Sequence, residues 1–148
     1  MPTPNTLPWK ELVLAAAGDA KFSAPSNEAA LTAAEQNLQL LLPPELRSFL
    51  LEFDGVTADY GSNVIWPLSE ICRVNAEFRQ TEAFRDLYMP FDHLLFFGED
   101  GSGDQFAFAI QADGTIHNPD IFRWEHETDS RSWFASHLKQ YFERRFKP

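Results

Sequence analysis

The glycine-rich segment 98–104 contains the residue types that most strongly suggest chemistry. Asp100, Ser102 and Asp104 place oxygen ligands at alternate positions, as the start of a calcium-binding loop does. Counted from Asp100, however, glutamines occupy the sixth and twelfth positions, where such a loop needs glycine and a bidentate glutamate. We therefore expect no metal and no cofactor, and predict a tight hairpin. Four residues are expected to shape it: Gly98, Gly101, Gly103 and Asp104.

Nucleophilic and acid–base catalysis have weaker support in the sequence. Ser102 lacks a Gly-x-Ser-x-Gly elbow, because Asp100 stands where the first glycine should be. Cys72 falls on the apolar face of a predicted helix, so we interpret it as a packing residue. His126, which follows Trp124 on one face of a predicted strand, is the best candidate for a general base. We predict a protein that is not an enzyme, with a small hydrolase or ligand-binding protein using His126 as an alternative.

Acidic residues dominate the region from Asp92 to Asp129, which holds nine acids and one base, Arg123. Its net charge of −8 accounts for most of the total of −10. Such a field steers a basic partner into contact, although acidic surfaces also serve solubility alone. We predict that exposed acids form a partner-binding surface: Glu99, Asp100, Glu125, Glu127 and Asp129. Asp59 and Tyr60, in a polar loop, are weaker candidates.

Length and composition restrict the class of protein. The 148 residues fit one domain, and a hydrophobic content of 44% is enough for a core. The single cysteine excludes a disulfide framework and favours a reducing compartment, so we expect a cytoplasmic protein. No apolar run is long enough for a membrane span, and none is expected. The excess of acid argues against direct binding of nucleic acid and favours a protein partner, with a monomer as the expected state.

Hydrophobic periodicity predicts four helices in the first half of the chain. One runs from 8 to 17, and a second begins after Pro25 with Ser26 as its N-cap. The third begins at Pro44 and ends at Gly55, because glycine takes a left-handed cap without a Cβ clash. A fourth begins near Leu68.

Strands are predicted in the middle of the chain, in four runs: 63–67, 94–97, 106–110 and 122–127. The continuous apolar run 94–97 is typical of a central strand covered on both faces. A closing helix is expected to start at Asp129 or Ser130 and to bury Phe134. Because helices and strands do not alternate, we predict a single α+β domain over 1–148, with a central, mostly antiparallel sheet flanked by helices.

Four motifs in order resemble the SUKH superfamily, which includes many bacterial immunity proteins of polymorphic toxin systems and a fungal cell-wall assembly regulator. The helix motif LPPELRSFLLEFDG covers 42–55 and ends at Gly55, and the strand-to-helix motif IWPLSEI covers 65–71 and includes Trp66. FFGEDGSGDQFAF at 96–108 resembles the central hairpin, and FRWEHE at 122–127 followed by SWF at 132–134 resembles the last strand and helix. The resemblance spans 26–146, while 1–25 is expected to form an N-terminal helix and extension.

The resemblance implies an α+β fold and a non-enzymatic role, namely binding a cognate toxin, often a nuclease, and blocking its active surface. Nuclease toxins bind phosphate, so their working surfaces tend to be basic and an acidic inhibitor complements them. We therefore predict an immunity protein that neutralises the C-terminal domain of a cognate polymorphic toxin by stoichiometric occlusion. The alternative is a regulatory adaptor of a cellular pathway, as the role of the fungal relative suggests. The resemblance does not imply which residues bind, because the family varies that surface with the toxin.

Overall fold

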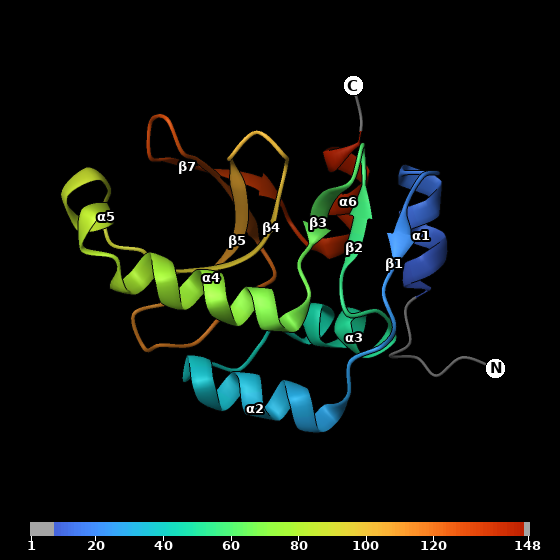
Figure 1. The fold of residues 1–148 in the computed structure, drawn as a ribbon, viewed down its shortest axis with the longest axis horizontal. Coiled ribbons are helices and arrows are strands. Elements are labelled where there is room, and N and C mark those ends of the chain that lie inside the picture. The colour runs from blue at the N-terminus through green and yellow to red at the C-terminus, as the bar shows by residue number, and fades with distance from the viewer. Residues whose placement is uncertain (1–7, 147–148) are drawn as a thin grey trace.

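The computed structural model describes residues 8–146 (Figure 1), so 1–7 and 147–148 of the predicted domain lie outside the described range. Six helices are found within it: α1 (Trp9–Ala16), α2 (Glu28–Leu38), α3 (Pro44–Glu52), α4 (Leu68–Gln80), α5 (Glu82–Leu87) and α6 (Leu138–Arg145). The strands are β1 (Lys21–Phe22), β2 (Val56–Ala58), β3 (Ser62–Ile65), β4 (Leu94–Glu99), β5 (Gln105–Ala109), β6 (Ile121–Glu125) and β7 (Ser130–Ala135). This arrangement confirms the predicted α+β class. None of the helices in the described part is long and apolar enough to cross a membrane.

The strands form two antiparallel sheets instead of the single sheet that was predicted. One has the order β1-β2-β3 and the other β4-β5-β6-β7. The two sheets meet where β3 adjoins β4, and there the Trp66 amide donates to the Phe97 carbonyl at 2.9 Å. A Cβ added to Gly98 would lie 2.0 Å from the Val64 carbonyl oxygen. Gly98 is therefore required by the close approach of the two strands, in addition to its place before the predicted hairpin.

Helices pack on both sides of this junction (Figure 1). Helix α4 lies against α2 and β4, while α6 packs against α1 and β7. Asn75 fixes α4 to β4: its side-chain amide donates to the Phe96 carbonyl at 2.9 Å and its oxygen accepts from the Phe96 amide at 2.9 Å. Tyr141 of α6 is fully buried and donates its hydroxyl to the Val64 carbonyl at 2.7 Å. Burial raises the pKa of Tyr141, so the phenol stays a neutral donor.

Two helix ends differ in detail from the sequence-based expectation. Asn27, and not Ser26, caps α2, because the Asn27 side chain accepts from the Ala30 amide at 2.8 Å. Gly55 has the expected positive φ of +103°, but it lies beyond the C-cap of α3, which is Phe53. A Cβ on Gly55 would lie 2.9 Å from the Pro67 nitrogen. The glycine is therefore required by the turn into β2 and not by the helix end.

The predicted closing helix from Asp129 or Ser130 is wrong, because residues 130–135 form β7 and pair with β6. Asp129 has a φ of +59°, and its amide donates to the Glu125 carbonyl at 2.8 Å, which closes a β6–β7 hairpin. Phe134 therefore lies on a strand, 4.8 Å from the ring centroid of Phe106. The helix begins only at Leu138, where the His137 ring nitrogen Nδ1 caps it by accepting from the Gln140 amide at 3.1 Å.

Candidate functional site

Three hairpin turns lie along one edge of the molecule: the β2–β3 turn (59–61), the β4–β5 turn (100–103) and the β6–β7 turn (126–129) (Figure 1). We call this row of turns, with the strand ends beside it, the hairpin edge. It brings together all seven predicted partner-binding residues. Seven acids and three arginines meet there: Asp59, Glu99, Asp100, Asp104, Glu125, Glu127, Asp129, Arg123, Arg131 and Arg145.

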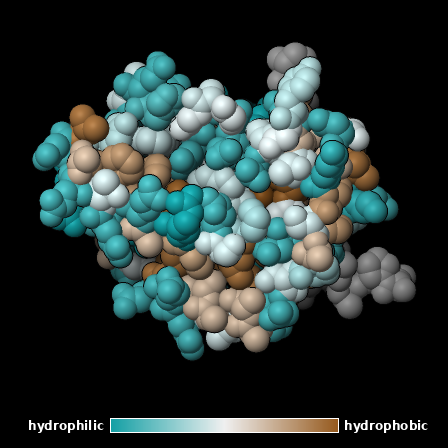
Figure 2. All heavy atoms as spheres, viewed as in Figure 1, coloured by the Kyte–Doolittle hydropathy of each residue, from teal (hydrophilic) through white to brown (hydrophobic). Residues whose placement is uncertain are grey.

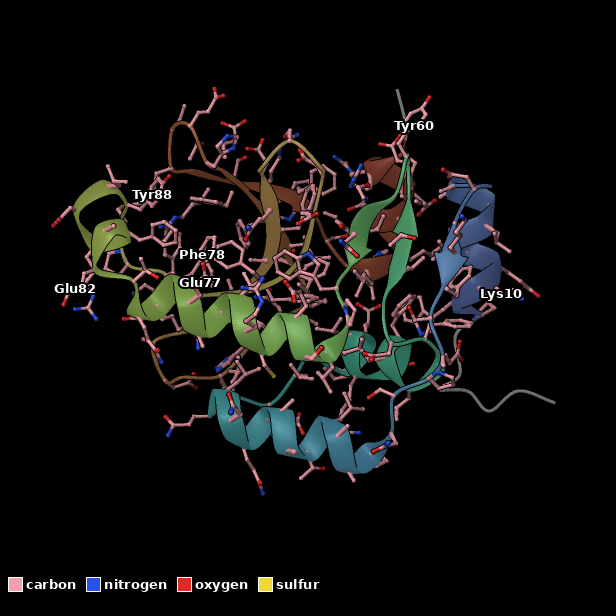
Figure 3. All side chains as sticks on the ribbon, in the orientation of Figure 1. Lys10, Tyr60, Glu77, Phe78, Glu82 and Tyr88 are labelled. Atoms are coloured by element: carbon pink, nitrogen blue, oxygen red, sulfur yellow. The ribbon has the colours of Figure 1, made fainter. Side chains whose placement is uncertain are left out.

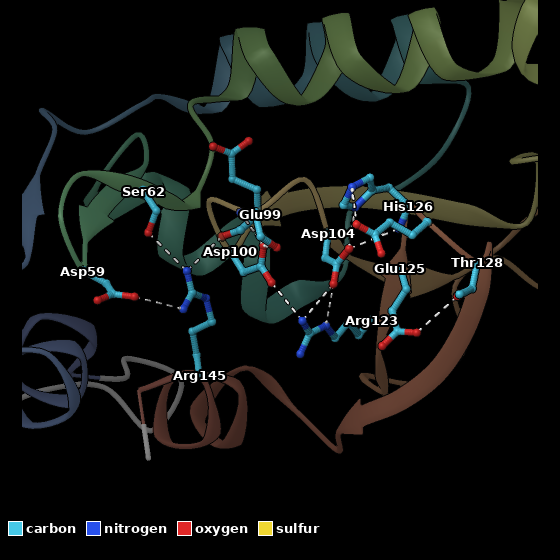
Figure 4. A network of polar contacts seen from close by, with 12 residues as sticks. Asp59, Ser62, Glu99, Asp100, Asp104, Arg123, Glu125, His126, Thr128 and Arg145 are labelled. Atoms are coloured by element: carbon cyan, nitrogen blue, oxygen red, sulfur yellow. Dashed lines mark hydrogen bonds and ion pairs between the residues drawn. The ribbon is translucent and has the colours of Figure 1, made fainter.

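Arg123 of β6 ties the β4–β5 turn to its neighbour (Figure 4). Its Nη2 atom donates to Asp104 Oδ2 at 2.8 Å and to Asp100 Oδ2 at 3.0 Å. Asp100 also accepts the amide and hydroxyl hydrogen bonds of Ser102 at 2.9 and 2.7 Å. The Asp100 side chain is consequently only 14% exposed, so the expectation that it would be an exposed acid is wrong. Arg123 and Ser102 satisfy its oxygens inside the hairpin.

Asp104 is the most buried acid of the edge, with 8% of its surface exposed. Its Oδ1 atom lies 2.7 Å from His126 Nδ1 and accepts from the His126 amide at 3.1 Å. Burial acts to raise the pKa of Asp104, but hydrogen bonds from Arg123 and His126 outweigh it and hold that pKa below its ordinary value. Asp104 thus remains an ionised link between the two hairpins, which extends its predicted role in shaping one of them.

Arg145, in the last turn of α6, joins the β2–β3 turn to the end of β4 (Figure 4). Its Nη2 atom donates to Ser62 Oγ at 3.1 Å and to the Glu99 carbonyl at 3.2 Å. Its Nη1 atom lies 3.7 Å from Asp59 Oδ2. No local sequence pattern connects Arg145 with Glu99 and Asp59, which precede it by 46 residues or more.

The β2–β3 turn has an unusual backbone. Asp59, Tyr60 and Gly61 all have positive φ angles, of 52°, 66° and 84°. An aromatic residue in this region is strained, and such strain persists only where surrounding contacts fix it. The Asp59 amide donates to Asp19 Oδ2 at 3.0 Å, which fastens the turn from outside. The Tyr60 residue is 102% exposed, so its side chain has no packing contact within residues 8–146 that would offset the strain.

Asp129 was predicted as an exposed acid, and this too is wrong, because its side chain is only 15% exposed. It accepts three hydrogen bonds, from the Met89 amide at 2.8 Å, Trp124 Nε1 at 2.7 Å and Arg131 Nη2 at 3.0 Å. Burial acts to raise the pKa of Asp129, but these three donors lower it further than burial raises it. Asp129 therefore fastens the segment before β4 to the β6–β7 turn.

The other three acids keep more contact with solvent. The Glu127 side chain is 84% exposed. Glu125 and Glu99 are half-buried, and each accepts one side-chain hydrogen bond, from Thr128 Oγ1 at 3.2 Å and from Trp66 Nε1 at 3.3 Å respectively. Trp66 itself is buried. The outward charge of the hairpin edge thus comes from fewer acids than the sequence suggested.

The Asp104–His126 contact has the form of a general base with an orienting carboxylate, but the surroundings favour a structural role. A Cβ on Gly103 would lie 2.9 Å from His126 Cε1, so the glycine backbone covers the ring. The only hydroxyl of the loop, on Ser102, donates to Asp100. Within residues 8–146, no group of three or more histidine, cysteine or acidic side chains is placed to hold a metal ion. The Asp104–His126 contact therefore joins the β4–β5 and β6–β7 hairpins.

Comparison with known families places the chain within one of them. The SUKH_6 family model, described as SMI1-KNR4 cell-wall, matches residues 28–142. The matched range contains all three turns of the hairpin edge and leaves α1 and β1 outside. A search of curated proteins gave no match.

Proposed function

The chain belongs to the SUKH family described as SMI1-KNR4, and from that membership we propose that it is an immunity protein that neutralises a cognate polymorphic toxin. The family includes both immunity proteins and SMI1/KNR4 regulators. In this proposal the partner is a basic toxin domain, a nuclease in particular, which the protein occludes in a one-to-one complex in the cytoplasm. The role requires binding and no catalysis, which fits the way in which Ser102, Asp104 and His126 are used to build the hairpin edge.

The observation that carries the proposal is the fully exposed Tyr60 at the tip of a strained turn, which a hydrogen bond from the Asp59 amide to Asp19 holds in place. Tyrosine is among the residues that contribute most to protein–protein binding, because it brings a large amphipathic surface at a low cost in side-chain entropy. Figure 3 shows Tyr60 standing clear of the β2–β3 tip. Within residues 8–146 the Tyr60 ring makes no contact that stabilises this backbone conformation, and we infer that the ring serves to contact another molecule.

The acids of the hairpin edge complement a basic partner. Glu127 is the most exposed of them, and Glu125 lies at the start of the same turn. Because the Debye length is about 8 Å at physiological salt, these charges act mainly at close range, by steering encounter and fixing orientation. Asp104 and Asp129 contribute less, since arginines already neutralise them. We infer that Glu125, Glu127 and Tyr60 form the binding centre.

Calorimetric titration against the C-terminal toxin domain encoded by the adjacent gene tests the proposal, at low and high salt. We expect tight one-to-one binding that weakens with salt, and a Glu125→Lys/Glu127→Lys variant that binds more weakly and depends less on salt. The control is Glu11→Lys/Glu143→Lys, which makes the same charge change at exposed positions on α1 and α6. Asp100→Lys is a poor choice, because it would break the contact with Arg123. Binding that is equal in both variants would remove the hairpin edge as the interface.

The alternative is a non-enzymatic adaptor that docks on a cellular protein. The cell-wall description of the matching family favours it, since that description refers to regulators and not to toxin systems. An adaptor would use the same fixed surface, so the partner distinguishes the two. Failure to bind the adjacent toxin domain, together with capture of a defined envelope or signalling protein that Tyr60→Ala releases, would favour the adaptor.

A further inference from the structure

A second surface, remote from the β2–β3 turn, has the form of a binding pocket. A cavity of about 360 Å³ lies between the end of α4, helix α5 and the segment 88–91. Its walls are aromatic: Phe78, Phe84, Tyr88 and Phe91, with neighbouring ring centroids 5.0 to 6.3 Å apart. Phe78 and Tyr88 lie together in this region in Figure 3, while Glu82 points outward from α5. The volume lies at the lower end of ordinary ligand pockets and suits a single aromatic group.

The polar groups of the pocket are predominantly basic, although the protein carries a net charge of −10. Arg79 and Arg85 line it together with one acid, Asp92. Arg79 donates from Nη2 to the Leu94 carbonyl at 3.1 Å, whereas its buried Nε atom has no partner within the described residues. Burial lowers the pKa of Arg79, and the neighbouring Asp92 acts in the opposite direction. A carboxylate placed over this wall would compensate the charge of Arg79.

The outer wall of the pocket is held in place by the β6–β7 turn. Arg131 donates to the carbonyls of Pro90 and Met89, both at 2.8 Å, and its guanidinium lies 4.9 Å from the ring centroid of Phe91. Asp129 holds the Met89 amide from the same side. These contacts fix Met89 and Pro90 in the absence of a ligand, so ordering this segment costs little entropy when a ligand binds. These contacts also make the pocket wall continuous with the hairpin edge.

The rim of the pocket is apolar and exposed, which distinguishes a protein partner from a small ligand. Met89 lines the pocket and is 59% exposed, and Leu87, at the end of the adjoining helix α5, is 69% exposed. Helix α5 buries none of its residues. In Figure 2, hydrophobic atoms gather among hydrophilic ones at the end of the molecule that α5 occupies. A small molecule inside the cavity would leave this rim in water, whereas a protein surface would cover it.

We propose that this pocket receives an aromatic side chain of the protein partner, with a carboxylate beside the ring that pairs with Arg79 and Arg85. The inference rests on the proposed function only in that the partner is a protein. It adds a second anchor, of opposite charge to the hairpin edge, which fixes the orientation of the partner. Aromatic residues, methionine and arginine are the types enriched at the centres of such interfaces.

The chemistry of the pocket can be tested on the isolated protein. Met89 is one of only two methionines in the chain, so labelling methionine methyl groups with ¹³C gives a spectrum in which Met89 reports on the rim. We expect N-acetyl-L-phenylalanine to shift the Met89 methyl signal saturably, and N-acetyl-L-phenylalaninamide to bind about tenfold more weakly because it lacks the charge. Arg85→Ala should weaken binding of the acid about threefold. The control is Arg73→Ala, which removes an arginine that does not line this pocket and should leave binding of the acid unchanged. No shift with either probe, or equal binding of the two, would overturn the proposal.

A second titration of the labelled protein, with the toxin domain, tests whether the occupant is a protein side chain. A shift of the Met89 signal on complex formation, lost or reduced in Arg85→Ala, supports the proposal. A complex that forms without moving that signal refutes it and leaves a small aromatic acid as the ligand, provided that the first probe binds. Absence of any complex refutes the proposed function alone, because the probe titration on the isolated protein still decides whether the pocket binds an aromatic carboxylate.

Discussion

Tyr60 offers the sharpest prediction, because the structure implies that stability and binding depend on it with opposite signs. A left-handed backbone costs an ordinary L-residue about 1–2 kcal/mol. Asparagine adopts this conformation more readily, since its short side chain makes local hydrogen bonds. The Tyr60 ring is wholly exposed, so its removal sacrifices no packing. We expect Tyr60→Asn to raise the free energy of unfolding by about 0.5–1 kcal/mol, or Tm by about 2 °C.

Tyr60→Ala is the matched variant. It removes the ring, but alanine still carries a Cβ, so the backbone strain at positive φ remains. Its stability should stay within about 0.5 kcal/mol of the natural protein. Both variants should lose about 2 kcal/mol of binding, or about thirtyfold in Kd, since both lack the proposed anchor. Urea denaturation and calorimetric titration measure the two quantities. If Tyr60→Asn is no more stable than Tyr60→Ala, the turn is not strained as argued; if both bind normally, Tyr60 is not the anchor.

Three further predictions concern the frame that holds the hairpin edge. Because the folded-state pKa of Asp104 lies below its ordinary 3.8, its contribution to stability is complete above that pH and is lost as pH falls through the lower value. Asp104→Asn should lower the free energy of unfolding by about 2 kcal/mol at pH 7 and reduce its dependence on pH in the acid range, as measured by denaturation curves. An unchanged dependence on pH would exclude the Arg123 contact as its source. Gly98→Ala should prevent folding or lower the free energy of unfolding by more than about 4 kcal/mol, as followed by circular dichroism. The control is Gly18→Ala, whose added Cβ has open space around it and should leave the stability unchanged. Asn75→Ala should cost about 3 kcal/mol, because buried groups of Phe96 lose their partners; a loss below about 1 kcal/mol would contradict the junction described between α4 and β4.

Local patterns were sufficient for the elements that their own sequence defines. The apolar spacing of α3, with Pro44 at its first turn, corresponds to the structure, and β5 (Gln105–Ala109) overlaps the predicted strand 106–110. The prediction for 129–142 was wrong because Phe134, Leu138 and Tyr141 have a helical spacing. Asp129, with its left-handed backbone, instead closes a turn after which residues 130–135 pair with β6 as an antiparallel strand. Strands β1 and β2 are only two and three residues long, so no periodicity marks them.

The predicted site residues lie along the hairpin edge, and their binding of a partner stays a prediction, whereas the expected exposure of two of the acids was wrong. Counting acids from 92 to 129 does not predict their burial, because burial depends on partners that the window did not contain. Arg131 and Arg145 lie outside this window. Arg123 lies inside it, but the count gave only its charge and not which acids it contacts. Asp100 and Asp129 were therefore expected in solvent, although arginines hold both inside the fold. Pairing across strands determines which acids remain free, and a single sequence does not record that pairing.

Hydrogen–deuterium exchange of the protein with and without the adjacent toxin domain tests the central claim most directly. If the hairpin edge is the interface, protection on binding should appear at the turns 59–61, 100–103 and 126–129, and should be reduced at high salt. The exposed faces of α1 and α2 should exchange at unchanged rates. A complex that protects those helices while the three turns stay unprotected would contradict the account, and absence of a complex would contradict the immunity role itself.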